Sequence, residues 1–242
     1  MKTLVLIPTY NERDNLPVLV KDLMTIPGVS AMVLDDQSPD GTGKVADGLA
    51  RDYPGRVLVL HRTGQRGLGV SYLEGFRNAI AGDWEYVCQM DADLSHDPKY
   101  LPEMRALAAS GADLVIGSRY VAGGSIPEWP LLRRAISRIG CRYARMMLRV
   151  PIQDATSGFR AYRAETLTAI DLDEVRADGY GFQVEMAYRV HNMGGRIAEV
   201  PIEFRDRTLG RSKMSMRIVV EALWLVTRWG LRDRVRPSRH AA

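Results

Sequence analysis

Cysteine is scarce in this sequence, with only two residues in a chain of 242. Cys88 and Cys141 lie in apolar surroundings, and no CxxC spacing occurs. This pattern does not fit a disulfide-rich secreted scaffold. We interpret both residues as buried free thiols, which favours a reducing, cytosolic compartment.

Long hydrophobic runs are also absent. The apolar segment 4–7 near the N-terminus is too short for a signal peptide, and Pro8 ends it. No other stretch approaches the roughly 18 apolar residues that a membrane span needs. We therefore expect a soluble or peripheral protein. Without repeats or low-complexity segments, a 46% hydrophobic composition suits one large α/β domain, alone or with a small appendage.

The first half of the chain alternates short apolar runs with segments of helical periodicity. Such runs are typical of strands buried on both faces, and their alternation with helices predicts a doubly wound, mostly parallel sheet. Ligands of these sheets bind beyond the carboxyl ends of the strands. We expect strands at residues 4–7, 31–34, 57–60, 86–90 and 114–117, and helices at 15–24, 45–53, 70–81 and 98–109.

The second half has a different pattern. A strand is expected at 197–204, and a largely apolar helix at 218–229. Another helix is predicted at 131–150, with apolar residues on one face and arginines on the other. Those arginines are Arg134, Arg138, Arg142, Arg145 and Arg149.

Two carboxylates, Asp91 and Asp93, directly follow the fourth predicted strand. In an extended backbone, residues i and i+2 point to the same side. Two hard oxygen ligands can hold Mg²⁺ or Mn²⁺, with diphosphate oxygens and water completing the shell. Such a cation would neutralise a departing nucleoside diphosphate. A solvated loop, or the N-cap of the next helix, is the alternative interpretation.

Polar residues also follow the first two predicted strands. After the second strand, Asp36 is the better candidate to bind a base or ribose, whereas Asp40 fits the structural role of a turn residue. After the first, Tyr10 could stack on a base and Glu12 could accept a sugar hydroxyl. Asn11 is a plausible helix cap in the same segment.

Several cationic residues lie in or near predicted loops. The planar guanidinium of arginine suits phosphate, although a loop arginine is commonly a solvated surface group. Their grouping around residues 210–213 favours a flexible anion clamp. The candidates are Arg119, Arg133, Arg205, Arg207, Arg211 and Lys213.

Taken together, these segments resemble the dolichol-phosphate (polyprenol-phosphate) mannose synthases of glycosyltransferase family 2. The matching segments run from Leu6 to about Ser215, and their common order makes a chance similarity improbable. They are LIPTYNERDNLP, VLDDQSPDGT, RGLGVSYLEGF, MDADLSHDPKYLP, IGSRYVAGG, RRAISRIG, DATSGFRAYR, GYGFQVEMAYR and EVPIEFRDRTLGRSKMS.

The resemblance implies a GT-A fold, a Rossmann-like α/β fold with a mostly parallel central sheet and helices on both faces, over residues 1–215. Residues 216–242 would form a C-terminal amphipathic helix and basic tail, with no transmembrane domain. The implied reaction is an inverting transfer of mannose from GDP-mannose to dolichyl or polyprenyl phosphate. The implied cofactor is Mg²⁺ or Mn²⁺.

The resemblance also implies roles for individual residues. Catalysis would involve Asp91, Asp93 and Arg119. The metal ligands would be Asp93 and Ser95, where some family members carry glutamine in place of Ser95. The acceptor phosphate would bind Arg119, Arg133 and Ser137. The donor would bind Pro8, Tyr10, Glu12, Leu34, Asp36, Asp91, Ala92, Asp93 and Arg119, and a loop with Arg207 and Lys213 would close on its diphosphate.

A charge argument supports these cationic residues. A phosphate monoester has a second pKa near 6, so it is mostly dianionic at neutral pH and can attack without a general base. Two anions must then approach against a repulsion on the order of 4 kcal/mol for unit charges at 4 Å and an effective dielectric constant of 20. A divalent metal with Arg119, Arg133 and Lys213 can offset that repulsion.

Two rival hypotheses remain open at this point. The same fold could use UDP-glucose or UDP-GlcNAc, or transfer to a sugar hydroxyl, which needs a base such as Asp154. Alternatively, the net charge of +4 permits a non-enzymatic module that binds nucleotide sugars or nucleic acid. Acidic strand ends would repel a phosphate backbone unless metal is bound, so we predict no nucleic-acid partner.

A prenyl acceptor resides in a bilayer, which raises the question of membrane contact. The arginine stripe of the predicted helix 131–150 could face anionic headgroups, at about 1 kcal/mol per well-placed residue. The predicted helix 218–229 could lie in the interface or dock on a small membrane protein. Alternatively, its apolar side packs on the domain and the arginines are solvated. We expect a cytoplasmic protein, peripheral at the cytoplasmic face of the membrane.

Overall fold

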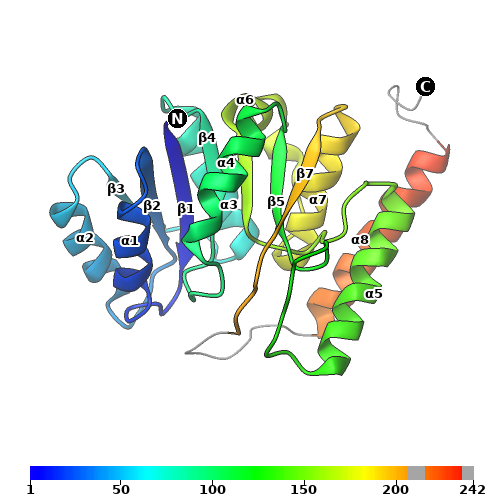
Figure 1. Cartoon of the computed structure of the whole chain (residues 1–242), viewed down its shortest axis with the longest axis horizontal. Coiled ribbons are helices and arrows are strands. Elements are labelled where there is room, and N and C mark those ends of the chain that lie inside the picture. Colours follow the sequence, from blue (N-terminus) through cyan, green and yellow to red (C-terminus); the bar gives the residue numbers. More distant parts are fainter. Residues whose placement is uncertain (207–215, 236–242) are drawn as a thin grey trace.

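The structure is a computed structural model that describes residues 1–206 and 216–235, without the side chains of Tyr180, 216–221 and 233–235. At its centre is a seven-stranded sheet with the strand order β3-β2-β1-β4-β6-β5-β7 (Figure 1). The strands are β1 (Thr3–Thr9), β2 (Val29–Asp35), β3 (Val57–His61), β4 (Tyr86–Gln89), β5 (Leu114–Ser118), β6 (Arg160–Arg163) and β7 (Ile197–Pro201).

All strands of the sheet run parallel except β6, which is antiparallel to both of its neighbours, β4 and β5. In the parallel register of β1 and β2, Pro8 lies beside Leu34 and Thr9 beside Asp35. The carboxyl ends of the parallel strands therefore meet along one edge of the sheet, the lower edge in Figure 1.

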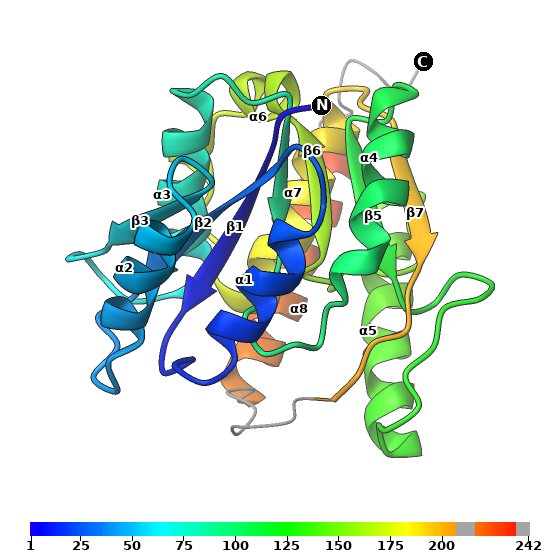
Figure 2. The same ribbon diagram turned by 60° about the vertical axis from the view of Figure 1, so that its left-hand side comes forward.

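Helices cover both faces of the sheet (Figures 1 and 2). Helices α1, α2 and α4 lie on one face, and α3, α6 and α7 on the other. Helices α5 and α8 pack against each other beside the β7 end of the sheet. The bounds are α1 (Leu16–Met24), α2 (Thr42–Asp52), α3 (Leu68–Ile80), α4 (Leu101–Ala109), α5 (Leu131–Leu148), α6 (Ala164–Ala169), α7 (Gly179–Asn192) and α8 (Met216–Val235), with short 3-10 helices η1 (Pro98–Tyr100) and η2 (Leu172–Glu174).

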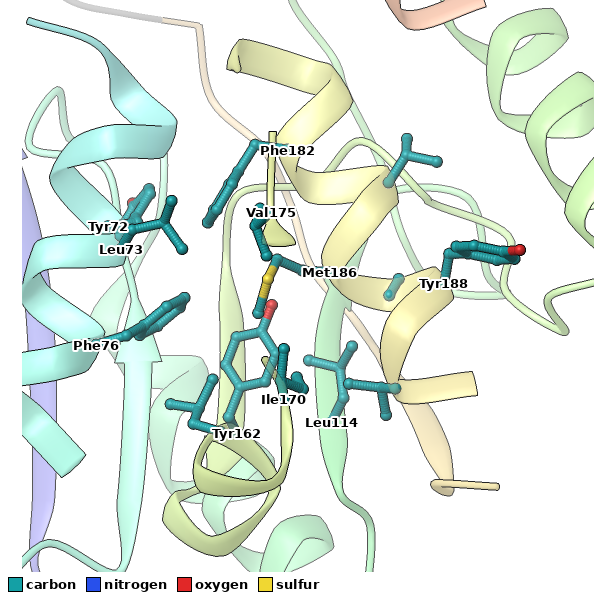
Figure 3. Close-up of a cluster of buried hydrophobic side chains, with 14 of the residues drawn as sticks. Tyr72, Leu73, Phe76, Leu114, Tyr162, Ile170, Val175, Phe182, Met186 and Tyr188 are labelled. Carbon is teal, nitrogen blue, oxygen red and sulfur yellow. The ribbon is translucent and has the colours of Figure 1, made fainter. Parts of the chain in front are cut away.

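Separate apolar cores form on the two faces. On one face, Tyr72 and Phe76 of α3 stack on Phe182 of α7, with ring centroids 5.9 and 6.4 Å apart (Figure 3). Tyr162 of β6 meets Phe76 edge-on at 5.5 Å. The other core contains buried leucines of α1 and α4, such as Leu16 and Leu101. Aromatic packing thus fixes the N-terminal half of α7 against α3.

The expected strands and helices are confirmed with small shifts in their bounds. The expected strand 197–204 ends earlier, because β7 stops at Pro201 and only one bridge, from Ser125 to Glu203, continues the pairing. The sequence pattern did not reveal β6, whose sequence is RAYR. Arg160 is fully buried there because its guanidinium donates to the carbonyls of Ser157, Gln183 and Ala155.

Helix α5 is confirmed, but only part of its expected apolar face is buried. Tyr143 and Met147 of that face pack against the core. Its buried positions are the small or compact Cys141, Ala144 and Leu148, while Ile136 and Ile139 are 51% and 68% exposed. Tyr143 also meets α8, because its hydroxyl lies 2.6 Å from Thr227 Oγ1, and a Cβ at Gly230 of α8 would lie 2.7 Å from the carbonyl oxygen of Met147. The outer face of α5 carries Ile136 and Ile139, together with exposed arginines.

Within residues 1–206 and 216–235, no helix is both long and apolar enough to cross a membrane.

Candidate active site

A buried arginine organises the end of β2 and the loop between β3 and α3. Arg62, whose side chain is 1% exposed, pairs with Asp36 and donates to Ser71 Oγ at 2.7 Å. The second carboxylate oxygen of Asp36 accepts the amide hydrogen of Gly67 at 3.2 Å. Asp36, predicted to bind the donor, thus also shapes the loop between β3 and α3. Asp40 accepts hydrogen bonds from the backbone and hydroxyl of Thr42, which confirms its predicted structural role.

Tyr10 lies at the same edge and already carries a planar partner. The guanidinium of Arg66 lies 4.8 Å from the ring centroid of Tyr10, and its Nη1 donates to the phenolic oxygen at 3.2 Å. Its Nη2 donates to the carbonyl of Gln37 at 3.3 Å. Arg66 therefore covers one face of the ring, and a base stacked on Tyr10 would use the other face or displace this guanidinium.

Glu12 begins the turn that leads into α1. Its backbone amide donates to Thr42 Oγ1 at 3.0 Å, and its carboxylate accepts from the side-chain amide of Asn15 at 2.9 Å. Asn15 is the N-cap residue of α1, so the interpretation of Asn11 as a helix cap is wrong. Asn11 has a φ of 62° and donates its amide to Ser38 Oγ.

The Asp91–Asp93 pair follows β4 in a compact turn. Asp93 is 4% exposed, and its Oδ1 accepts from both the backbone amide and the hydroxyl of Ser95, at 3.1 and 2.6 Å. Leu94 between them has a φ of 63°, which turns Ser95 back toward Asp93. Burial of Asp93 is inconsistent with a solvated loop, and the N-cap of η1 is Asp97. Ala92 packs in the core that includes α1 and α4.

Asp91 is held by two buried side chains. Its Oδ1 accepts from the phenol of Tyr72 at 3.5 Å, and its backbone amide donates to Nδ1 of His96 at 3.1 Å. Burial lowers the pKa of His96, so the ring is neutral near pH 7, and its proton is assigned to Nε2 because Nδ1 is an acceptor. Neither the motifs nor the family resemblance assigns a role to His96.

The oxygen atoms of this turn fit a hard divalent cation. Asp91 and Asp93 supply carboxylates and Ser95 a hydroxyl, the donor chemistry that Mg²⁺ and Mn²⁺ prefer. The part of the chain that the structure describes contains no group of three or more His, Cys, Asp or Glu side chains suited to a metal. Two carboxylates and a hydroxyl leave coordination positions for diphosphate oxygens and water.

Arg119, at the end of β5, is 5% exposed and forms a buried pair with Asp154. Its Nε and Nη2 each donate to one carboxylate oxygen at 2.7 Å, and its backbone amide donates to the same carboxylate at 3.0 Å. Nη2 also reaches Thr156 Oγ1 at 2.8 Å. Glu199 of β7 fixes Asp154 by accepting its backbone amide hydrogen. The guanidinium is therefore oriented before any ligand binds.

Aromatic rings connect the β4 turn to α5. His96 stacks on Phe159 at 5.2 Å and meets Phe204 edge-on at 5.6 Å. Phe204 meets Trp129 edge-on at 5.6 Å, and Arg119 lies 5.3 Å from the Phe204 ring. Segments that are distant in the sequence thus come together around Arg119.

Comparison with known sequences decides the family. Residues 4–170 match the sequence model for glycosyl transferase family 2. The chain belongs to glycosyl transferase family 2. It is 50% identical over 97% of its length to an undecaprenyl-phosphate mannosyltransferase of Micrococcus luteus, covering 96% of that protein. It is 47% identical over 98% of its length to a polyprenol monophosphomannose synthase of Mycolicibacterium smegmatis, covering 90% of that protein.

Comparison with solved structures concerns the fold. The family 2 chain resembles glucosyl-3-phosphoglycerate synthase of Mycobacterium tuberculosis, solved with Mn²⁺, UDP-glucose and phosphoglyceric acid. The TM-score is 0.69 at 20% identity, covering 94% of this chain and 80% of that one. A UDP complex of the same synthase gives 0.68 at 19% identity, with the same coverage. The predicted GT-A fold is confirmed.

The remaining predicted residues of this family 2 protein fall into two groups. Arg133 and Ser137 are half-buried, one turn apart near the start of α5, and Arg133 pairs with Asp206 at 3.3 Å. Arg205 is exposed and pairs with Glu203. Arg207, Arg211 and Lys213 lie outside the described residues.

The buried pair makes stability depend on pH. Burial alone would raise the pKa of Asp154, but the charge and hydrogen bonds of Arg119 outweigh burial and hold this pKa below its ordinary value. The stabilisation is fully present above the ordinary pKa of about 3.9 and is lost as pH falls through the lowered pKa. At pH 7, Asp154→Asn is expected to lower the free energy of unfolding by about 3–5 kcal/mol, because Arg119 stays buried without its counterion.

Urea unfolding between pH 7 and pH 3 measures this effect. The difference between Asp154→Asn and the unaltered protein should shrink toward the acid end. The matched control is Asp173→Asn, because Asp173 is 85% exposed and pairs with Arg77 at the surface. The control should cost less than about 1 kcal/mol. A pH-independent loss in Asp154→Asn would contradict this assignment.

Proposed function

We propose that the protein transfers a mannosyl group from GDP-mannose to a polyprenyl phosphate, with inversion at the anomeric carbon. The names of the two relatives, which are about half identical over nearly the whole chain, support this acceptor. The structural observation that carries the proposal is the state of Asp154. It is 0% exposed, and both of its carboxylate oxygens accept hydrogen bonds from the Nε–Nη2 edge of Arg119, so neither oxygen is free to deprotonate a sugar hydroxyl.

An acceptor that needs no general base can react although Asp154 has no free oxygen. A phosphate monoester is already mostly dianionic at neutral pH and can attack the anomeric carbon directly. The residues of the chain then bind, orient and screen charge. Arg119 is held rigid by Asp154, and Arg133 stands near the start of α5. Both would neutralise the approaching phosphate.

At the donor end, the Asp91–Ser95 turn would hold Mg²⁺ or Mn²⁺ through Asp93 and Ser95. When bound, the cation would stabilise the negative charge of the departing GDP. Tyr72 and His96 keep Asp91 in place, and the neutral His96 adds no positive charge that would compete for the carboxylates. Tyr10, Glu12 and the β1–β2 edge would hold the nucleoside.

The test is transfer of radiolabelled mannose from GDP-mannose to a short-chain polyprenyl phosphate, with Mg²⁺, with Mn²⁺ and with EDTA. We expect metal-dependent label in the lipid product. Transfer from UDP-glucose or UDP-GlcNAc, with none from GDP-mannose, would overturn the donor assignment. Transfer to a free sugar hydroxyl, with none to the phosphate, would overturn the acceptor assignment.

We also propose that the protein works at the cytoplasmic face of a membrane, which its two free, buried thiols support. The outer face of α5 exposes Leu132, Ile136, Ile139 and Met146 at 72%, 51%, 68% and 65%. Exposed apolar groups of this size mark interaction surfaces, and the exposed arginines of the same helix suit anionic headgroups. Trp224 of the adjoining α8 is 58% exposed.

Substitutions on the outer face of α5 should reduce transfer only to an acceptor that is embedded in a membrane. The double variant Ile136→Gln/Ile139→Gln is expected to lose binding to anionic vesicles in flotation and transfer to a long-chain acceptor embedded in them. Transfer to a short, soluble acceptor should remain normal, because both side chains are more than half exposed on the outer face of α5. Val18→Gln on α1 is the matched control, since Val18 is an apolar residue with 48% exposure on another helix. Unchanged flotation of the double variant would exclude this face.

A further inference from the structure

Trp129 precedes α5 and has a buried polar atom without a partner. The residue is 6% exposed, and its indole Nε1 has no hydrogen-bond partner among the residues that the structure describes. An indole nitrogen can only donate, and a buried donor is costly to leave unpaired. Most buried donors find an acceptor, so an unpaired one adjoining a candidate site indicates a ligand or ordered water.

Two arginines of the site lie over the ring of this residue. The guanidinium of Arg133 is 3.8 Å from a ring centroid of Trp129, and that of Arg119 is 5.5 Å away. Phe204 meets the same ring edge-on at 5.6 Å. A guanidinium stacked on an aromatic face keeps its N–H donors in its own plane, where an anion can still reach them. The indole thus packs against two cations, of which Asp154 already orients Arg119, and accepts none of their N–H hydrogen bonds.

The first backbone amides of α5 are further hydrogen-bond donors beside the indole and the two guanidinium groups. Pro130 is the N-cap residue of this helix, which continues for 18 residues. The first amide groups of a helix have no carbonyl partner within it, and the aligned peptide dipoles favour an anion at that end. Trp129 immediately precedes this N-terminus, so its unpaired N–H and the first-turn amides belong to one segment. Arg133 lies within the same first turn.

We propose that Trp129 binds the acceptor phosphate, donating its indole N–H to a phosphate oxygen while its ring holds Arg133 in a stacked orientation. This inference rests on the proposed function, because it deepens the acceptor side of the same site. The ligand class is a phosphate monoester, and the dianion fits two arginines, one indole N–H and a helix N-terminus. The phosphate would compete with Asp206, which pairs with Arg133 at 3.3 Å where both side chains are partly exposed.

Two substitutions separate the roles of the N–H and of the ring. Trp129→Phe keeps an aromatic face for Arg133 but removes the donor, and Trp129→Leu removes both. With a short soluble prenyl phosphate, we expect Trp129→Phe to raise the KM for the acceptor about tenfold, with kcat and GDP-mannose affinity nearly unchanged. Trp129→Leu should raise the acceptor KM further. The matched control is Trp84→Phe, which alters a partly buried tryptophan elsewhere in the chain and should change neither constant.

Inorganic phosphate provides a second probe that does not depend on turnover. Its Kd, measured by calorimetry, should rise in Trp129→Phe by the same factor as the acceptor KM, while the Kd for GDP stays constant. Equal weakening of GDP and phosphate, with a lowered Tm, would show a packing role only and overturn the proposal. An unchanged acceptor KM in Trp129→Phe would also overturn it. If the unaltered protein transfers no mannose to prenyl phosphate, the proposed function fails, whatever the variants bind.

Discussion

Replacing Arg119 by lysine is expected to lower turnover by roughly 10²- to 10³-fold, the cost typical of losing one preorganised donor to developing charge. Lysine keeps the positive charge but cannot form the two parallel hydrogen bonds that Asp154 makes with Nε and Nη2 of Arg119. The ammonium group would then rotate freely toward Asp154 or Thr156. The phosphate would meet a cation that is present but not oriented. Single-turnover transfer of mannose at saturating acceptor measures this loss directly.

Arg119→Ala is expected to cost at least as much turnover and also to destabilise the fold. It leaves Asp154 as an unpaired buried carboxylate, a change that typically costs about 3–5 kcal/mol. Turnover must therefore be normalised to folded protein by circular dichroism. The matched control is Arg105→Lys, because Arg105 is also buried but donates to the carbonyls of Pro27 and Met1. That control should lower Tm without lowering turnover of the folded enzyme. Near-normal turnover of folded Arg119→Ala would remove Arg119 from the mechanism.

The sheet could be predicted because its evidence is local. The strands at residues 4–7 and 31–34 are short apolar runs, and each is followed by a turn and a helix. The sequence did not predict the antiparallel strand β6, because its arginines interrupt the apolar pattern that is typical of a buried strand. The side chain of Arg160 donates to the carbonyls of Ser157 and Ala155 just before the strand and to the carbonyl of Gln183 in α7. The contact with α7 is a tertiary property.

In the site too, motifs within one segment could be predicted, whereas contacts between distant segments could not. The Asp91–Asp93 spacing and its position after a strand are visible in the chain. The engagement of Asp36 by Arg62 and of Arg119 by Asp154 is not, because these partners lie 26 and 35 residues apart. The sequence also did not predict a role for Trp129. A tryptophan in a loop carries no sequence signal, and its interest comes from an unpaired donor that only a folded environment creates.

The second large effect is expected at the Asp91–Ser95 turn. Asp93→Asn should lower metal-dependent transfer by roughly 10²-fold or more at fixed Mn²⁺, because an amide oxygen lacks the charge that a divalent cation prefers. The substitution is close to isosteric, and the amide oxygen can still accept from the amide and hydroxyl of Ser95. Folding should therefore be retained, and the defect should appear as a higher Mn²⁺ concentration for half-maximal activity.

Titration of activity against Mn²⁺ separates metal binding from a general loss. Asp97→Asn is the matched control, since Asp97 lies in the same segment and caps η1 by accepting the amide hydrogen of Lys99. Asparagine is also a good N-cap, so this variant should keep the Mn²⁺ requirement of the unaltered protein. If Asp93→Asn showed the same Mn²⁺ midpoint as the control, Asp93 would not be a metal ligand. Asp91 would then be the carboxylate of the turn to test next, because Tyr72 and His96 hold it in place.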